Sequence, residues 1–258
     1  SRTPDAHFLT EVRYKGTKVV SVSPDYAEST TSSDAWLNVK AGTDAALAMA
    51  MGHVILKEYY IDKETPYFKE YAKEFTDMPF LVRVEDINGT VQPGRFLNAK
   101  DLGRQEEGAD FQMVLIDELT NEIVVPNGTM GERHTNPQKW NLRLENRDTG
   151  AKIDPRLSVF DQREDVTIVK LPYFGDEEHE GVIERAIPTI TVQTADGPVK
   201  VTTVYDLILA NYGIDRGIGG EVATSYTDDT PYTPTWQEKI TGVKADIAIA
   251  TAREFADN

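Results

Sequence analysis

The chain has 258 residues, 40% of them hydrophobic, which is enough for one large domain or two smaller ones with a buried core. Lys and Arg number 27 against 43 Asp and Glu, a formal net charge of −16, which disfavours non-specific binding to nucleic acid or anionic lipid. Cysteine is absent, so these residues form neither a disulfide nor a thiolate-held zinc or iron–sulfur centre.

The first elements in chain order are a helix and a strand. Residues 4–14 have an early proline and apolar residues at helical spacing, and a glycine follows them. Residues 17–23 are rich in β-branched side chains and predict a strand. Ligands of open α/β sheets bind beyond the carboxyl ends of the strands, so the turn after this strand is a candidate binding loop. Its residues are Ser23, Pro24, Asp25 and Tyr26.

A second turn of the same kind follows a second predicted strand. Residues 35–39 predict a short strand that returns to the same edge, and a long apolar helix begins near residue 43 and runs to about residue 60. Gly42, Thr43 and Asp44 stand where this helix leaves its first amide groups unpaired. Local chemistry leaves two interpretations open: Thr43 or Asp44 caps the helix, or the turn holds a ligand.

Two predictions concern aromatic and imidazole side chains in the next helices. His53 lies inside the apolar arc of the long helix, which favours a hydrogen-bonded core residue over a metal ligand or a base. A further helix is predicted over residues 65–75 because a threonine and a proline open it. Its aromatic stripe predicts core packing of Tyr67, Phe68, Tyr71 and Phe75.

Residues 85–203 have short β-type runs separated by turn residues, and we interpret them as a β-rich insertion. Residues 189–193 and 199–202 are predicted to pair across one of these turns. Dipeptides that favour two-residue hairpins occur at three places, namely Asn88-Gly89, Asn127-Gly128 and Asp196-Gly197.

The last part of the chain returns to helical patterns. Helices are predicted over residues 203–212, 233–240 and 245–256, and the apolar side chains of the last one are expected to pack on a sheet. No strand follows to use that helix, which indicates a piece of a longer protein. The predicted fold class is α/β: a Rossmann-like αβα unit with a β-rich insertion and C-terminal helices, a fragment of a larger multidomain subunit. The predicted domains are a cofactor-binding part (1–84), the insertion (85–203) and a helical return (204–258).

Several stretches together resemble one family. They are TPDAHF (3–8), YKGTK (14–18), SPDYAE (23–28), GTDAA (42–46), AMGH (50–53), YFG (173–175), TTVYDL (202–207) and AREFADN (252–258). These stretches resemble the catalytic, molybdenum-containing alpha subunit of membrane-bound respiratory nitrate reductase. That family belongs to the molybdopterin oxidoreductase (DMSO reductase) superfamily, and its full subunit is far longer than this chain.

The resemblance implies a cofactor, an activity and partners for the full subunit. The cofactor is molybdenum-bis(molybdopterin guanine dinucleotide), and an iron–sulfur cluster lies in the full subunit but outside this segment. The implied activity is the reduction of nitrate to nitrite by oxygen-atom transfer at molybdenum, with electrons from quinol. The implied partners are the rest of the alpha subunit, an iron–sulfur beta subunit and, indirectly, a membrane cytochrome b gamma subunit, with a peripheral location on the cytoplasmic face of the cell membrane.

The resemblance also implies which residues hold the cofactor. In the family, the strand-end loop and the Gly-Thr-Asp turn hold the guanosine part of one cofactor, and no catalytic residue or metal ligand is assigned within this segment. A carboxylate such as that of Asp44 can accept hydrogen bonds from the ring N–H and the exocyclic amine of guanine. The corresponding residues here are Ser23, Pro24, Asp25, Tyr26, Gly42, Thr43 and Asp44.

Two alternatives stay open at this point. The same scaffold could act on chlorate, selenate or a sulfoxide, because the substrate path lies outside this segment. The chain could instead be a non-catalytic interaction domain that kept the fold and lost the cofactor.

Overall fold

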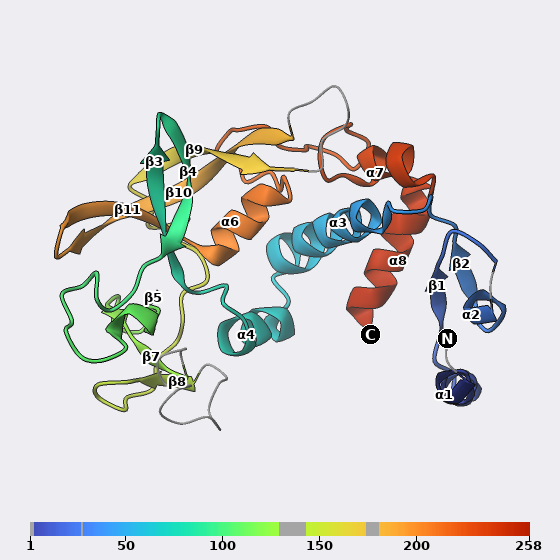
Figure 1. The fold of residues 1–258 in the computed structure, drawn as a ribbon, viewed down its shortest axis with the longest axis horizontal. Helices are drawn as coiled ribbons and strands as arrows, with labels where there is room; N and C mark the ends of the chain where they lie inside the picture. Colours follow the sequence, from blue (N-terminus) through green and yellow to red (C-terminus); the bar gives the residue numbers. More distant parts are fainter. Residues whose placement is uncertain (1–2, 27, 129–142, 174–180) are drawn as a thin grey trace. The chain divides into compact units, whose positions relative to one another are not determined.

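The computed structural model describes residues 3–26, 28–128, 143–173 and 181–258 (Figure 1). The chain forms two compact units, the first made of Ser1–Ile55 with Ala223–Asn258 and the second of Leu56–Val222. The second unit is therefore inserted between two parts of the first. The boundaries predicted at 84/85 and 203/204 differ from this division, because both fall inside the second unit, the former within a strand.

The first unit combines helices with two short strands. Strand β1 runs parallel to β2, and helix α3 contacts both α7 and α8. The helix and strands predicted for residues 4–14, 17–23 and 35–39 are present, although both strands are shorter than expected. The elements are α1 (Thr3–Tyr14), β1 (Val20–Val22), α2 (Glu28–Thr31), β2 (Ala35–Leu37), α3 (Asp44–Ile55), α7 (Pro234–Thr241) and α8 (Ala245–Asp257).

The core of the first unit lies between α3, α8 and the end of β2. Leu37, Leu47 and Ala248 belong to one buried cluster, so α8 packs on a helix through a small side chain. The expectation that the apolar side chains of α8 pack on a sheet is wrong for Phe255, which is 73% exposed. His53 is buried and its ring meets that of Tyr226 edge to face, with 5.8 Å between the ring centres, which confirms its prediction as a core residue.

The second unit contains most of the strands. The long apolar helix predicted to residue 60 changes to a π-helix at residue 56, where the second unit begins. The elements of this unit are η1 (Leu56–Asp62, a π-helix), α4 (Pro66–Phe75), β3 (Leu81–Ile87), β4 (Thr90–Phe96), η2 (Ala109–Phe111, a 3₁₀-helix), β5 (Leu115–Ile116), β6 (Ile123–Val124), β7 (Pro126–Asn127), β8 (Arg143–Asn146), β9 (Asp165–Pro172), β10 (Val182–Thr194), β11 (Gly197–Thr203) and α6 (Val204–Asn211).

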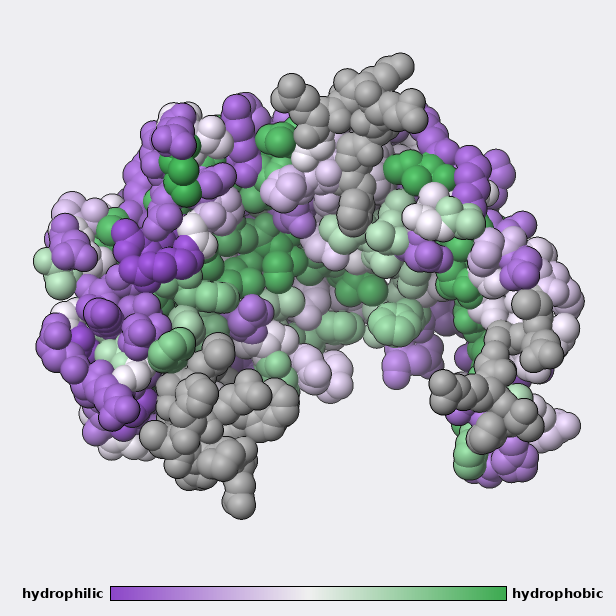
Figure 2. All heavy atoms as spheres, viewed as in Figure 1, coloured by the Kyte–Doolittle hydropathy of each residue, from purple (hydrophilic) through white to green (hydrophobic). Residues whose placement is uncertain are grey.

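Its main sheet has five antiparallel strands in the order β4-β3-β11-β10-β9. Strand β10 pairs with β9 through its first half and with β11 through its second half, and the edge strands β4 and β9 contact each other. The sheet therefore curls, and a register shift between Val82 and Val84 bends it further. In Figure 2 an apolar area lies over α6, whereas hydrophilic residues predominate over β3, β4 and β11.

Two of the three predicted hairpins are confirmed. Asn88 and Gly89 join β3 to β4 with positive φ angles of 56° and 80°, as a tight turn between antiparallel strands requires. Residues 195–196 join β10 to β11 between the paired residues Thr194 and Gly197, and here the positive φ angle, 114°, is at Gly197. The hairpin at Asn127-Gly128 stays a prediction: β7 pairs with β8, which begins at Arg143, and the residues directly after the turn are not described. Residues 129–142 between them lie outside the described part of the chain.

The prediction that the aromatic stripe of α4 is core is also wrong for most of its members. Tyr67 is 69% exposed, and Tyr71 and Phe75 are each 49% exposed. Their rings follow one another along the helix, with 6.3 Å and 5.2 Å between successive ring centres. The sequence spacing correctly places these rings on one face, but spacing alone does not specify what that face contacts.

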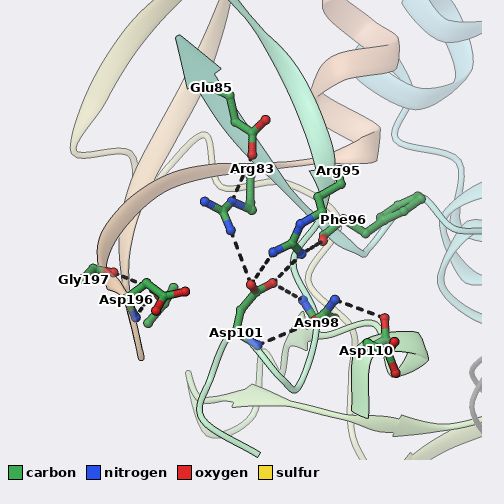
Figure 3. Close-up of polar contacts among 10 residues, drawn as sticks. Arg83, Glu85, Arg95, Phe96, Asn98, Asp101, Asp110, Asp196 and Gly197 are labelled. Carbon is green, nitrogen blue, oxygen red and sulfur yellow. Dashed lines mark hydrogen bonds and ion pairs between the residues drawn. The ribbon is translucent and has the colours of Figure 1, made fainter. Parts of the chain in front are cut away.

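An ion-pair cluster fixes the loop that follows β4 (Figure 3). The carboxylate of Asp101 is nearly buried and accepts hydrogen bonds from Arg95 at 2.5 and 2.7 Å, from Arg83 at 3.3 Å and from the Asn98 amide at 3.1 Å. Burial alone would raise the pKa of Asp101, but the bonds from Arg95 and the Asn98 amide, with the two arginine charges, outweigh it and lower the pKa. The ionised Asp101 carboxylate therefore connects the loop to β3 through Arg83 and to β4 through Arg95.

Replacing Asp101 by Asn is expected to loosen this region by about 2–4 kcal/mol, because two arginines lose a nearly buried partner. Hydrogen–deuterium exchange of peptides from β3 and β4 should then become faster. The matched control is Asp196→Asn, since the exposed Asp196 carboxylate makes no hydrogen bond or ion pair among the described residues. Equal exchange in the two variants would show that the cluster does not stabilise the hairpin.

Candidate functional site

The two loops singled out in the sequence leave one edge of the parallel strand pair. Val22 and Leu37 are paired residues at the ends of β1 and β2, so the chain leaves both strands in the same direction. The Ser23 amide donates to the Leu37 carbonyl oxygen at 3.2 Å, which ties the first loop to the end of the second strand. The parallel pairing confirms the prediction that the two loops share an edge.

The first loop, residues 23–26, is organised by its own serine. The Ser23 hydroxyl donates to the Asp25 carbonyl oxygen at 2.9 Å and lies 3.0 Å from the Asp25 carboxylate. Pro24, Asp25 and Tyr26 are exposed. The loop therefore presents one carboxylate and one aromatic ring to solvent, with the carboxylate held by a single short-range contact.

A tryptophan that the sequence analysis did not select holds this loop in place. Trp36 lies on β2, and its indole N–H donates to the Ser23 carbonyl oxygen at 2.9 Å. Its ring meets Tyr26 edge to face, with 5.3 Å between the ring centres. The available signal was a tryptophan within the short strand predicted over residues 35–39, and in the structure this side chain is 38% exposed.

The second loop is a turn that needs glycine. Gly42 has a φ of +81°, a conformation that side chains disfavour, and an added Cβ there would meet no atom within 4 Å. Its glycine is therefore required by backbone conformation, while the space around it stays open. The Thr43 hydroxyl donates to the Lys40 carbonyl oxygen at 2.7 Å, and the Ala46 amide bonds to the Thr43 carbonyl oxygen at 3.0 Å.

This geometry separates the two interpretations of the turn. Among the described residues, no backbone amide donates to the Thr43 hydroxyl or to the Asp44 carboxylate, so neither side chain caps α3. Asp44 is exposed at the first position of α3 and makes no hydrogen bond or ion pair within the described part of the chain. The positive end of the helix dipole stabilises its negative charge. Asp44 therefore offers two free acceptor oxygens at the sheet edge.

The structure thus places all seven predicted residues in the first unit, in two loops that follow the paired ends of β1 and β2. No hydrogen bond joins residues 24–26 to residues 42–44 within the described ranges. Between them they present two carboxylates, an aromatic ring and an open glycine turn. Such a set accepts hydrogen bonds from a ligand with N–H and O–H donors and a flat face.

The described residues contain no group of three or more histidine or acidic side chains arranged to hold a metal ion. None of the helices in the described ranges is long and apolar enough to cross a membrane.

Comparison with known proteins assigns the chain to a family. The model of the molybdopterin oxidoreductases matches residues 2–233. The chain is 50% identical over its whole length to the nitrate reductase alpha chain of Bacillus subtilis and 46% identical to the respiratory nitrate reductase 1 alpha chain of Escherichia coli. It is 36% identical, also over its whole length, to the chlorate reductase alpha subunit of Ideonella dechloratans.

These relatives are much longer proteins. The chain covers 21% of the Bacillus subtilis protein and 22% of the Escherichia coli protein, or about a fifth of each. The family model nevertheless spans both loops and most of both units. The chain therefore belongs to the molybdopterin oxidoreductase family.

Proposed function

We propose that this chain is a segment of a respiratory nitrate reductase alpha subunit and contributes part of a molybdopterin guanine dinucleotide site. The observation that carries the proposal is the exposed carboxylate of Asp44, which has no partner among the described residues and stands at the sheet edge shared with the 23–26 loop. The identity of 46–50% to nitrate reductase alpha chains, over the whole of this chain, supports the same assignment.

The residues present fit a guanosine group. Guanine has a ring N–H and an amine beside each other, and a carboxylate can accept from both at once, which favours guanine over adenine. Asp44 supplies that carboxylate, while Gly42 leaves open space beside the turn. In the 23–26 loop, the Asp25 carboxylate can still accept hydrogen bonds from ribose hydroxyls beyond its contact with Ser23. The exposed Tyr26 ring offers a flat apolar face.

The first unit would then be part of a Rossmann-like α/β layer. Its two parallel strands leave unpaired edges within the described residues, and parallel strands ordinarily lie inside larger sheets. We infer that the remaining strands come from the rest of the alpha subunit. The helices α3 and α8 would cover one part of that sheet.

In the complete enzyme the molybdenum cofactor would supply the oxygen-atom transfer that converts nitrate to nitrite. This chain's residues would bind and orient the guanosine end of the cofactor. The partners we propose are an iron–sulfur beta subunit and, through it, a membrane cytochrome b gamma subunit. The assembly would lie peripherally on the cytoplasmic face of the cell membrane, with electrons drawn from quinol.

Chlorate is the second candidate substrate, because a chlorate reductase alpha subunit also aligns with the whole chain. Its identity of 36% is lower than the 50% to a nitrate reductase alpha chain, so nitrate is the better-supported substrate. Turnover of the two anions by the complete enzyme, compared as kcat/KM, distinguishes them.

The site is tested by Asp44→Asn in the full-length subunit. The amide replaces one acceptor by a donor and removes the negative charge, so one hydrogen bond to guanine is lost, the other is no longer charge-assisted, and cofactor retention should fall at least about tenfold. The measurement is the GMP released by acid from each purified subunit after extended dialysis.

The matched control is Asp246→Asn. Asp246 is also an exposed acid in the first turn of a helix of the same unit, but its carboxylate accepts a bond from the Ile247 amide and lies outside both loops. Asp228 is unsuitable as a control, because its carboxylate organises its own loop through Thr224 and Ser225. Wild-type GMP content in Asp44→Asn would remove Asp44 from the guanine site.

A further inference from the structure

A pocket of about 450 Å³ lies in the second unit and has no part in the proposed guanosine site. It is bounded by η1, α4, the start of α6 and the loop of residues 155–161. Cations exceed carboxylates by one in its lining, although the whole chain has a net charge of −16. The lining cations are Lys69, Lys73, Arg156 and Arg216, and the lining carboxylates are Glu64, Glu118 and Asp161.

Three of these cations already have strong partners. Lys69 pairs with Glu64 at 2.6 Å, and Lys73 pairs with Asp154, a residue outside the pocket, at 2.5 Å. Arg216 pairs with the buried Asp206 at 2.5 Å, and its guanidinium lies 4.1 Å from the centre of the Phe160 ring. These three side chains give the pocket wall a fixed shape more than they give it free charge.

Arg156 is different, because most of its hydrogen-bonding capacity is unused. Its side chain is 9% exposed and its Nε donates to Glu118. Its two terminal nitrogens make no hydrogen bond or ion pair within the described residues. A guanidinium presents these nitrogens as a fixed fork that matches two oxygens of a carboxylate or phosphate.

Two tyrosines add further unused donors to the same pocket. Tyr60 on η1 and Tyr205 on α6 are 8% and 4% exposed, and neither hydroxyl has a hydrogen-bond partner in the described part of the chain. Burial raises the pKa of Tyr205 strongly despite the opposing charge of Arg216, and burial also raises that of Tyr60. Both hydroxyls therefore stay protonated and can donate.

We propose that this pocket binds an oxyanion, the phosphate or carboxylate group of a small molecule, through the terminal nitrogens of Arg156 and the hydroxyls of Tyr60 and Tyr205. These three side chains line one cavity and these donors have no partner among the described residues, so a ligand that only accepts hydrogen bonds can engage all three together. The site lies in the other unit from Asp44, so it does not depend on the guanosine assignment.

The test uses the intact protein that carries this segment, with inorganic phosphate and acetate as separate probes. Hydrogen–deuterium exchange localises binding to peptides of residues 155–161 and 204–211, away from any other anion site. Increasing probe concentration should slow exchange in both peptides. Phosphate acting at lower concentration than acetate would indicate a phosphate ester as the natural ligand, and the reverse order would indicate a carboxylate.

Three variants make the result specific. Arg156→Gln should raise the half-maximal probe concentration at least about tenfold, and Tyr205→Phe, which keeps the ring, should raise it severalfold. The control is Arg163→Gln. The Arg163 guanidinium lies 4.3 Å from the centre of the Phe160 ring, as that of Arg216 lies close to it, but Arg163 is exposed and does not line the pocket. No protection of the wild type by either probe, or protection unchanged in Tyr205→Phe and Arg156→Gln, would overturn the proposal.

Discussion

Replacing Asp206 by Asn is expected to destabilise the second unit by about 3–5 kcal/mol, because it removes one half of a buried ion pair. The Asp206 side chain is fully buried and its two oxygens accept four hydrogen bonds. One oxygen accepts from Ser158 Oγ at 2.6 Å and Arg216 Nη1 at 2.5 Å, and the other from the Val159 amide at 2.9 Å and Thr203 Oγ1 at 2.8 Å. An amide would point its own donors at two of these donors.

The same residue also stabilises the start of α6. Thr203 is the N-cap, and its hydroxyl oxygen accepts from the Asp206 amide at 3.1 Å while the hydroxyl donates to the Asp206 carboxylate, a reciprocal arrangement like a capping box. Hydrogen–deuterium exchange in α6 and in residues 155–160 should therefore accelerate together. The control is Asp161→Asn, whose exposed carboxylate has no hydrogen bond or ion pair among the described residues. Exchange confined to the α6 peptide would show that Asp206 does not connect the two segments.

Acid is expected to remove a large part of the stability of the second unit, starting below about pH 4. Burial alone would raise the pKa of Asp117, but bonds from the Asp154 amide, the Thr120 hydroxyl and the Leu119 amide outweigh it and lower the pKa. Asp101 behaves in the same way through its arginines. Because the folded pKa values lie below the unfolded value of about 3.9, the contribution is complete above that value and is lost as pH falls through the folded pKa values.

The measurement is the urea midpoint of the full chain by circular dichroism at pH 6, 4 and 3. The midpoint should fall over this range, and the fall should be smaller in the double variant Asp101→Asn with Asp117→Asn, which starts less stable at pH 6. A midpoint that stays constant to pH 3 in the wild type would contradict the role of these anionic carboxylates.

Local signals in the sequence predicted local structure well. The helix starts at Thr203 and Thr233 follow from side chains that cap a helix, and in both the hydroxyl oxygen accepts from the amide three residues later. The turn at Asn88-Gly89 follows from the positive φ angles that those residues tolerate. In each case the physical cause lies within a few residues of the signal.

Contacts between distant residues were not predictable from those signals. The hydrogen bond from Ser158 to Asp206 joins residues 48 positions apart in the sequence. The bond from Arg156 to Glu118 joins residues 38 positions apart. The exposed face of α4 was misassigned for a related reason, because helical spacing groups Tyr67 with Tyr71 but carries no information about a partner. The division into units likewise depends on which distant segments pack together.

The candidate guanosine site combines both kinds of inference. Its residues came from two short motifs, and the parallel pairing of β1 with β2 confirms the shared edge that the sequence predicts. The hydrogen bond from Trp36 to Ser23 needed the structure, because the donor and the acceptor are thirteen positions apart in the sequence.

Replacing Trp36 by Phe should keep the ring contact with Tyr26 but lose this hydrogen bond. Hydrogen–deuterium exchange at residues 23–26 should therefore rise severalfold, while that of α3 stays unchanged.

The most direct test is the structure of the full-length subunit with its cofactor bound. We predict that the ring N–H and the amine of one guanine lie within hydrogen-bonding distance, about 2.7–3.2 Å, of the two Asp44 carboxylate oxygens, with the ribose beside residues 23–26. A guanosine group bound elsewhere, with Asp44 facing solvent or another protein segment, would contradict the assignment of this sheet edge.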